Sequence, residues 1–157
     1  MKRSFLVLAL LFASPALADV PAPPTPAGSI IGPALHVSAL APALHFYVDG
    51  LGMSVNMSMG PPDRRETILG FSRDPSQPGI ILLADTSGAK PQAIGHAFGY
   101  DRLVLRIADL DATAARLKAA GFTPSPIRDV AMGYRMMIAT DADGYKLELV
   151  ERKARPK

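Results

Sequence analysis

The sequence predicts an α+β fold built from two modules, each of which runs strand, helix and then three strands. The order of elements between residues 30 and 84 returns between residues 102 and 151. The helical segments VSALAPALHFYVDGLGM and IADLDATAARLKAAGF can also be superposed in sequence. An internal repeat of about seventy residues indicates two duplicated halves that complete one fold.

The first module begins with an apolar run at residues 30–37, which is compatible with a β-strand. Ser38 is expected to cap the next helix, and Pro42 is tolerated in its first turn. Gly50 and Gly52 supply the stop. The turn sequences GPPD and DPSQPG then separate three further strands. These strands are predicted at residues 53–59, 65–72 and 79–84.

The second module begins with the alternating strand 102–107. Asp109 can cap the following helix and Gly121 ends it. One face of this helix carries the apolar residues Leu110, Ala114, Leu117 and Ala120. The remaining elements are a short extended piece near Ile127, a strand at 134–140, the turn DADG at 141–144 and a strand at 145–151.

The first eighteen residues, MKRSFLVLALLFASPALA, have the pattern of a signal peptide: a basic start, a short apolar run and small residues before the cleavage point. The apolar run is far shorter than the ~20 residues that a membrane crossing needs. We therefore expect a secreted or periplasmic protein without an integral membrane segment after cleavage. The expected divisions are a signal peptide (1–18), a proline-rich linker (19–29), the folded domain (30–152) and a basic tail (153–157).

Composition excludes several function classes. The chain has no cysteine, so it forms no disulfide and has no thiolate nucleophile. Cleavage after Ala18 would remove Lys2 and Arg3 and leave 15 basic residues against 14 acidic ones, a net charge of about +1. Basic and aromatic residues are not interleaved as they are on nucleic-acid surfaces. No nucleic-acid partner is expected.

Three motifs carry a resemblance to a known family: LHVSALAPALHFYVDGLGM, IADLDATAARLKAAGF and DADGYKLELVE. In this order and spacing they closely resemble the vicinal oxygen chelate superfamily, which includes glyoxalase I, bleomycin-resistance proteins and extradiol dioxygenases. The resemblance covers about residues 30–152. It implies paired βαβββ modules whose strands curl into an open barrel with a ligand on the concave face. It does not imply one activity, because the scaffold hosts several chemistries.

Strand alternation predicts which side chains share that concave face, because successive residues of a strand point to opposite sides. The residues expected to pack on the helices are Leu35, Val37, Leu103, Leu105, Ile107, Leu147 and Leu149. The cavity side then receives Gly32, Ala34 and His36 from the first strand, Arg102, Val104 and Arg106 from the second module's first strand, and Lys146, Glu148 and Val150 from its last.

Metalloenzymes of the superfamily bind a divalent metal through His, Gln or Glu at matching strand positions. The resemblance puts these positions at Gly32, at Leu82 or Leu83, at Arg102 and at Glu148. Only Glu148 matches in type, because glycine and leucine lack donors and arginine stays protonated. We therefore expect no cofactor, and expect Arg102 and Glu148 to form an ion pair. A rebuilt divalent metal site from His36, Glu148 and His96 is the minority interpretation.

The remaining polar residues leave alternatives open. His36 is either a ligand contact or a structural strand residue, with a smaller share for a metal or proton-transfer role. Arg102 and Arg106 suit an anionic ligand, although Arg106 could simply reach solvent. His45 is expected to face solvent or a neighbouring subunit, and His96 lies in a glycine-flanked loop where a site role is open.

The favoured hypothesis is an exported, dimeric domain of this superfamily that binds a small anionic organic molecule through His36, Arg102, Arg106 and Glu148. Whether it is an enzyme stays open. The competing hypothesis is a metal-dependent enzyme resembling lactoylglutathione lyase or an extradiol dioxygenase. A third is a periplasmic module that binds copper or a protein partner, suggested by Met57 and Met59 and the methionines of the second half, since thioethers bind Cu(I).

Overall fold

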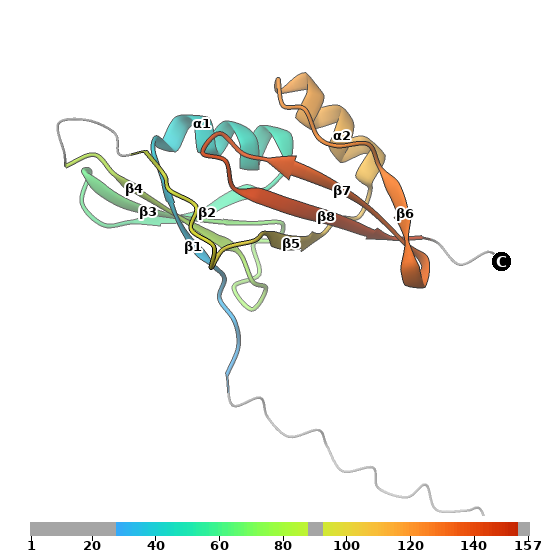
Figure 1. The fold of residues 1–157 in the computed structure, drawn as a ribbon. Coiled ribbons are helices and arrows are strands. Elements are labelled where there is room, and N and C mark those ends of the chain that lie inside the picture. Colours follow the sequence, from blue (N-terminus) through green and yellow to red (C-terminus); the bar gives the residue numbers. More distant parts are fainter. Residues whose placement is uncertain (1–27, 88–92, 154–157) are drawn as a thin grey trace, which may run out of the picture.

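The structure is a computed structural model that describes residues 28–87 and 93–153. The predicted signal peptide, most of the linker and nearly all of the basic tail lie outside these residues. The elements form two four-stranded sheets, and both helices lie on the same side of them (Figure 1). None of the helices in the described part is long and apolar enough to cross a membrane.

The two modules have the predicted order of elements. The first comprises β1 (Ala34–Val37), α1 (Leu40–Leu44), the π-helical turn η1 (His45–Gly50), β2 (Ser54–Met59), β3 (Arg64–Gly70) and β4 (Ile80–Asp85). The second comprises β5 (Leu103–Arg106), α2 (Leu110–Ala119), β6 (Arg128–Val130), the 3-10 turn η2 (Ala131–Gly133), β7 (Tyr134–Thr140) and β8 (Lys146–Arg152).

Sheet topology repeats between the modules. The strand orders are β1-β4-β3-β2 and β5-β8-β7-β6, so each position in one sheet has its equivalent in the other. β1 runs parallel to β4 and β5 parallel to β8, while the remaining pairs are antiparallel. Each sheet keeps two edge strands and stays open. The α+β fold with two βαβββ modules is therefore confirmed.

Two details of the first module differ from the prediction. The strand begins at Ala34 rather than at Ile30, and both Ile30 and Ile31 are exposed. Ser38 is not the helix cap: Ala39 occupies that position and makes no side-chain bond to the helix. The backbone N–H of Ser38 instead donates to Asp143 Oδ2 over 3.1 Å, because the end of β1 meets the DADG turn of the second module.

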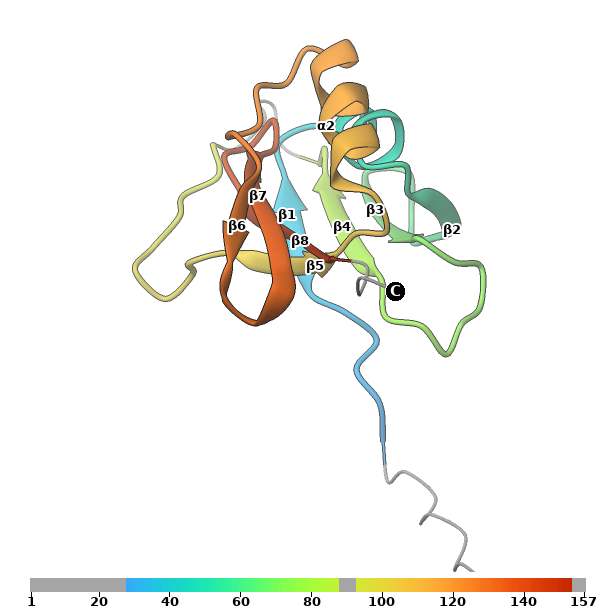
Figure 2. The same cartoon turned by 90° about the vertical axis from the view of Figure 1, so that its right-hand side faces the viewer.

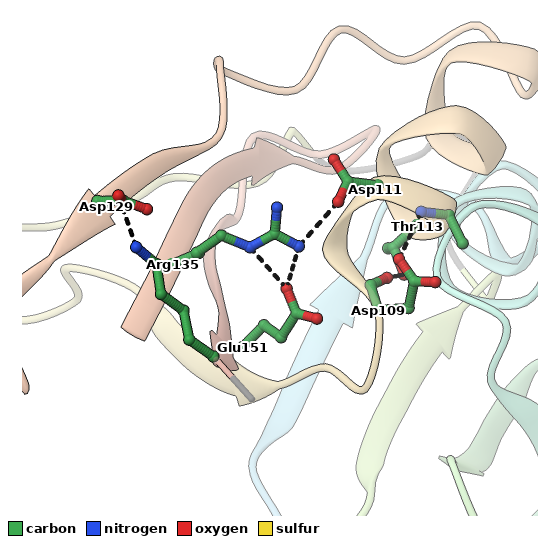
Figure 3. A network of polar contacts seen from close by, with 8 residues as sticks. Asp109, Asp111, Thr113, Asp129, Arg135 and Glu151 are labelled. Carbon is green, nitrogen blue, oxygen red and sulfur yellow. Dashed lines mark hydrogen bonds and ion pairs between the residues drawn. The ribbon is translucent and has the colours of Figure 1, made fainter. Parts of the chain in front are cut away.

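The second helix has both of its predicted ends. Asp109 Oδ1 accepts the Ala112 N–H at 2.9 Å, as Figure 3 shows, and so caps the first turn of α2. At the other end, Gly121 has a φ of +84°, and the N–H of Phe122 donates to the Leu117 carbonyl at 2.9 Å. This left-handed glycine closes the helix and lets the chain turn toward β6.

A single core joins the two modules beneath the helices. Phe46 and Tyr47 are completely buried in this core. Phe46 packs edge-to-face on Phe122 with ring centroids 4.9 Å apart, so the first helical segment packs directly on the second module. Figure 2 shows the helical segments of both modules side by side above the strands. The core therefore sets the orientation of the two sheet faces that point away from the helices.

Candidate functional site

Arg102 and Glu148 meet on the face of the second sheet that is turned away from the helices. Val104 pairs with Glu148 and Arg106 with Val150, so these side chains share one face. The Arg102 Nε donates to Glu148 Oε2, and its Nη1 pairs with Asp101. These bonds and charges raise the pKa of Arg102, with the bond to Glu148 the largest cause. The predicted ion pair is confirmed.

A cavity of about 580 Å³, which we call the aromatic cavity, adjoins this ion pair. Its charged residues are Asp101, which is bound to Arg102, and Lys146, two residues before Glu148 on β8. Among the described ion pairs Lys146 takes part in none. His96, Phe98 and Tyr100 supply aromatic walls, and the Phe98 side chain is fully exposed. The cavity thus offers aromatic surface and an available ammonium group.

Hydrogen bonds connect the loop at residues 96–100, which carries the aromatic side chains of this cavity, to β8 and to the turn before it. His96 Nε2 donates to the Asp143 carbonyl at 2.8 Å, and the Tyr100 hydroxyl donates to the Lys146 carbonyl at 2.9 Å. Tyr145 packs against both rings, with centroid distances of 4.5 Å to His96 and 5.4 Å to Tyr100. Burial raises the pKa of both Tyr100 and Tyr145, so both phenols stay protonated at neutral pH. The loop is held in place before any ligand arrives.

The turn DADG also binds the first module. The Tyr47 hydroxyl donates to Asp141 Oδ2 at 2.9 Å, and Asp141 Oδ1 accepts the N–H groups of Asp143 and Tyr145. Burial raises the pKa of Asp141 despite these bonds, and it raises the pKa of Tyr47 as well. Two of the sequence motifs, HFY and DADG, therefore interact inside the protein.

His36 lies in a different place. Its strand position confirms the predicted alternation, because Leu35 and Val37 are buried while His36 is exposed. It lines a cavity of about 180 Å³ on the first sheet, together with Arg64, Glu66 and Asp85. No hydrogen bond of its ring is present among the described residues. His36 is thus available to a ligand, but it does not share the cavity beside Arg102.

Arg106 also lies apart from Arg102, although both belong to the same face of one strand. It lines a third cavity, of about 360 Å³, at the end of β5. Arg106 follows Arg102 by four residue steps of extended chain, which puts their Cα atoms about 13 Å apart. The structure therefore brings together Arg102 and Glu148 and places His36 and Arg106 in two other cavities. The contribution of each to ligand binding stays a prediction.

The positions that the resemblance assigns to metal ligands offer few donor atoms. Gly32 has a φ of +148°, and a Cβ there would lie 1.9 Å from the Gly79 carbonyl oxygen, so a ligating side chain could not replace it without moving the backbone. Leu82 and Leu83 have no donor atoms, and Arg102 is bound to Glu148. Within residues 28–87 and 93–153, no three His, Asp or Glu residues gather as metal ligands do.

The other histidine and the methionines have structural surroundings. His45 is exposed, and its ring contacts Asp49 at 2.7 Å and the Ala120 carbonyl at 3.0 Å. The hydrogen bond to Asp49 is the main cause that raises the His45 pKa. Met57 and Met59 lie on β2 in the first sheet, whereas Met136 and Met137 lie buried on β7 in the second. These two groups of thioethers belong to separate sheets.

Phe98, Tyr100 and Lys146 line the aromatic cavity, but the sequence does not predict them as site residues. Strand alternation places Lys146 on the open face without indicating a role, and Phe98 lies in the same glycine-flanked loop as His96. The signal for Lys146 was its place two residues before Glu148 on one strand face. Phe98 gave no such signal, because its position depends on how the loop packs against β8.

Solved structures share this fold. The trypanothione-dependent glyoxalase I of Leishmania major is 20% identical over 80% of this chain and 87% of its own, with a TM-score of 0.66. The antibiotic-binding protein TnmS3 of Streptomyces is 21% identical over 80% and 97%, with a TM-score of 0.61. A glyoxalase family protein of Enterococcus faecalis is 21% identical over 78% and 94%, with a TM-score of 0.55. At these identities the likeness concerns the fold.

The family is settled by sequence. No curated protein matches the chain. The model of one protein family, described as Glyoxalase/Bleomycin resistance protein/Dioxygenase superfamily, matches residues 17–149 and so spans both modules. Together with the two βαβββ modules and their open sheets, this match shows that the chain belongs to the glyoxalase, bleomycin-resistance and dioxygenase superfamily.

Proposed function

We propose that this protein is an exported domain that binds a small anionic organic molecule without a catalytic metal. The observation that carries the proposal is the ion pair of Arg102 and Glu148 beside the aromatic cavity. In this ion pair, two residues at positions that the family uses for metal ligands bind each other instead. Export rests on the sequence of residues 1–18.

The aromatic cavity supports the choice of ligand class. A volume of about 580 Å³ falls in the range of small-molecule sites, which is roughly 300 to 1,000 Å³. Phe98 and Tyr100 provide flat apolar surface, and Lys146 provides a positive charge that an anionic group can pair with. An aromatic carboxylate would use both features at once. Arg102 lies at the edge of the cavity, where Glu148 and Asp101 hold its guanidinium in place.

Ligand binding can be tested with benzoate and other small aromatic carboxylates. A true ligand raises the thermal midpoint by mass action. Lys146→Met keeps most of the side-chain stem and removes the charge, so it should reduce the shift strongly. Lys118→Met removes an exposed charge from α2, outside this cavity, and should leave the shift intact. If no carboxylate raises the midpoint, or if both variants reduce the shift equally, the proposed site is wrong.

A metal-dependent enzyme of glyoxalase or dioxygenase type is the second candidate. It is favoured by Glu148, which stands at a family ligand position, and by the structural likeness to a glyoxalase I. Elemental analysis of protein purified from the periplasm separates the two proposals. Near-stoichiometric Ni, Zn, Fe or Mn that Glu148→Ala removes would support the enzyme and overturn the metal-free proposal. Copper that disappears when Met57 and Met59 are replaced would support the third hypothesis.

We also propose that the domain functions as a homodimer. Several apolar side chains remain exposed on the sheets in the single chain, among them Met57, Met59 and Val104, with exposed fractions of 53, 42 and 58%. Apolar side chains exposed on a sheet can be covered by a second subunit. Sedimentation equilibrium should give a dimer mass, and Val104→Lys should weaken the association. A monomer across the micromolar range would contradict this part of the proposal.

A further inference from the structure

The cavity that contains Arg106 lies at the junction of the two modules. The first module contributes Leu51 and Gly52 from the end of its helical segment, and Phe71 from the loop after β3. The second contributes the end of β5 and the first turns of α2. Its volume is about 360 Å³, enough for a small organic molecule. It shares none of its lining residues with the aromatic cavity.

Arg116 is held in this cavity by neutral partners. Its Nη2 donates to the Thr113 hydroxyl at 2.8 Å and to the Leu51 carbonyl at 3.4 Å. Thr113 is buried and its own hydroxyl donates to the Asp109 carbonyl, so the first contact is rigidly placed. Gly52, at a φ of +79°, lies against the guanidinium: a Cβ there would be 3.5 Å from Arg116 Nε. These contacts orient the guanidinium, and within the described part of the chain its Nε and Nη1 have no hydrogen-bond partner.

Arg106 adds a second guanidinium to the same cavity. Its side chain is exposed, and no described carboxylate lies within ion-pair distance of Arg106 or Arg116. The contrast with Arg135 is direct, because Arg135 binds Glu151 at 2.9 Å and Asp111 at 2.8 Å in the network of Figure 3. Among the described residues that line the cavity, Asp109 is the one acidic group, and its Oδ1 accepts the helix N–H of Ala112. The cavity therefore keeps an excess of positive charge.

We propose that this inter-module cavity is a second binding site, specific for a small organic molecule with a carboxylate or phosphate group. A guanidinium presents N–H donors in a planar fork that matches such oxyanions. Arg116 is pre-oriented for this contact, and Arg106 closes on the anion from the end of β5. Leu51 and Phe71 receive the apolar part of the molecule. Since both modules contribute, the ligand bridges the two halves of the chain.

NMR titration of the full chain tests this site. Phenylphosphate and benzoate are titrated separately, with the amides of Gly52 and Thr113 reporting on this cavity and that of Gly144 on the aromatic one. At least one anion should shift Gly52 and Thr113, and the tighter of the two identifies the head group. Arg106→Gln should weaken this binding about tenfold, as expected for the loss of one charge-assisted hydrogen bond. Arg116→Lys, which keeps the charge but loses the fork, should weaken it in the same direction.

Arg64→Gln is the matched control, because it removes an equal charge from the cavity of His36. It should bind as the unchanged protein does. The proposal is overturned if neither anion moves Gly52 and Thr113, if Arg106→Gln binds with unchanged affinity, or if Arg64→Gln causes an equal loss. Lys146→Met affects only the shifts at Gly144, so this inference and the proposed function can fail independently.

Discussion

The two modules have the same strand order but place different chemistry where their first and last strands meet. In the first module, β1 and β4 bring His36 beside Leu83. In the second, β5 and β8 bring Arg102 to Glu148. The faces turned to the helices are apolar in both modules and enter one core. Packing therefore requires similarity on one face of each repeated strand and permits divergence on the other.

The largest expected effect comes from breaking the shared core. Phe46 contacts Tyr47 in its own module and Phe122 in the other. Phe46→Ala should lower the free energy of unfolding by about 3–5 kcal/mol and should leave a single transition, because both modules depend on the ring. Urea denaturation followed by circular dichroism and tyrosine fluorescence measures both. Phe98→Ala should change little, since Phe98 is exposed. Two separate transitions would mean that the modules unfold independently.

A smaller loss should follow from cutting the polar link between the modules. Tyr47→Phe removes the hydroxyl that donates to Asp141 and leaves a buried carboxylate oxygen without its partner. Such a loss costs about 1–3 kcal/mol. The measurement is again denaturant unfolding. Tyr134→Phe, on a partly buried tyrosine with no described hydroxyl bond, should cost much less. Equal losses of stability in the two variants would mean that the hydrogen bond from Tyr47 to Asp141 contributes little to stability.

The two helices should respond differently to loss of the residue before them. Asp109→Ala removes a true cap and should cost about 1 kcal/mol. Ser38→Ala should cost only a few tenths of a kcal/mol, since the Ser38 side chain does not cap its helix. Thermal unfolding of the two variants under identical conditions gives the comparison. A loss for Ser38→Ala as large as that for Asp109→Ala would restore Ser38 as a cap.

The smallest effect concerns pH. Burial raises the pKa of Asp141 above its ordinary value of 3.8, so the folded protein holds the proton of this carboxyl group more tightly than the unfolded chain does. The stability from this group is complete below the unfolded pKa and is lost as pH rises through the folded pKa. The stability of the unchanged protein relative to Asp141→Asn should therefore decline from acid toward neutral pH. A relative stability that rises with pH would show the opposite shift.

Much of the fold could be predicted because local signals agreed with the final packing. Alternation identified Leu35 and Val37 as buried and His36 as exposed, and Asp109 and Gly121 mark the ends of α2 as expected. The prediction that Ser38 caps the first helix was wrong. A serine before a helix can also turn its backbone toward another segment, and the Ser38 N–H donates to Asp143. A cap is a local interaction, whereas this contact joins residues 105 positions apart.

The candidate site was only partly predictable for a related reason. The ion pair of Arg102 and Glu148 could be predicted because the family resemblance assigns both residues to positions of metal ligands, which lie close together in the fold. Which cavity a side chain enters depends on loops and on the junction between modules, and neither has a sequence period. Arg106 therefore shares a strand face with Arg102 but lines a cavity with Arg116. Strand alternation predicts on which side of the sheet a side chain lies, but it does not predict which cavity along that side the side chain enters.

The turn DADG has a consequence for engineering the chain. Exposed hairpin turns are usually the places where a tag or an extra domain can be inserted without harm. This turn receives the Ser38 N–H, the Tyr47 hydroxyl and the His96 ring on its two aspartates. An insertion between Asp141 and Asp143 would detach three separate segments at once. The exposed loop between β3 and β4, near Gln77, is a far better place for a fused label.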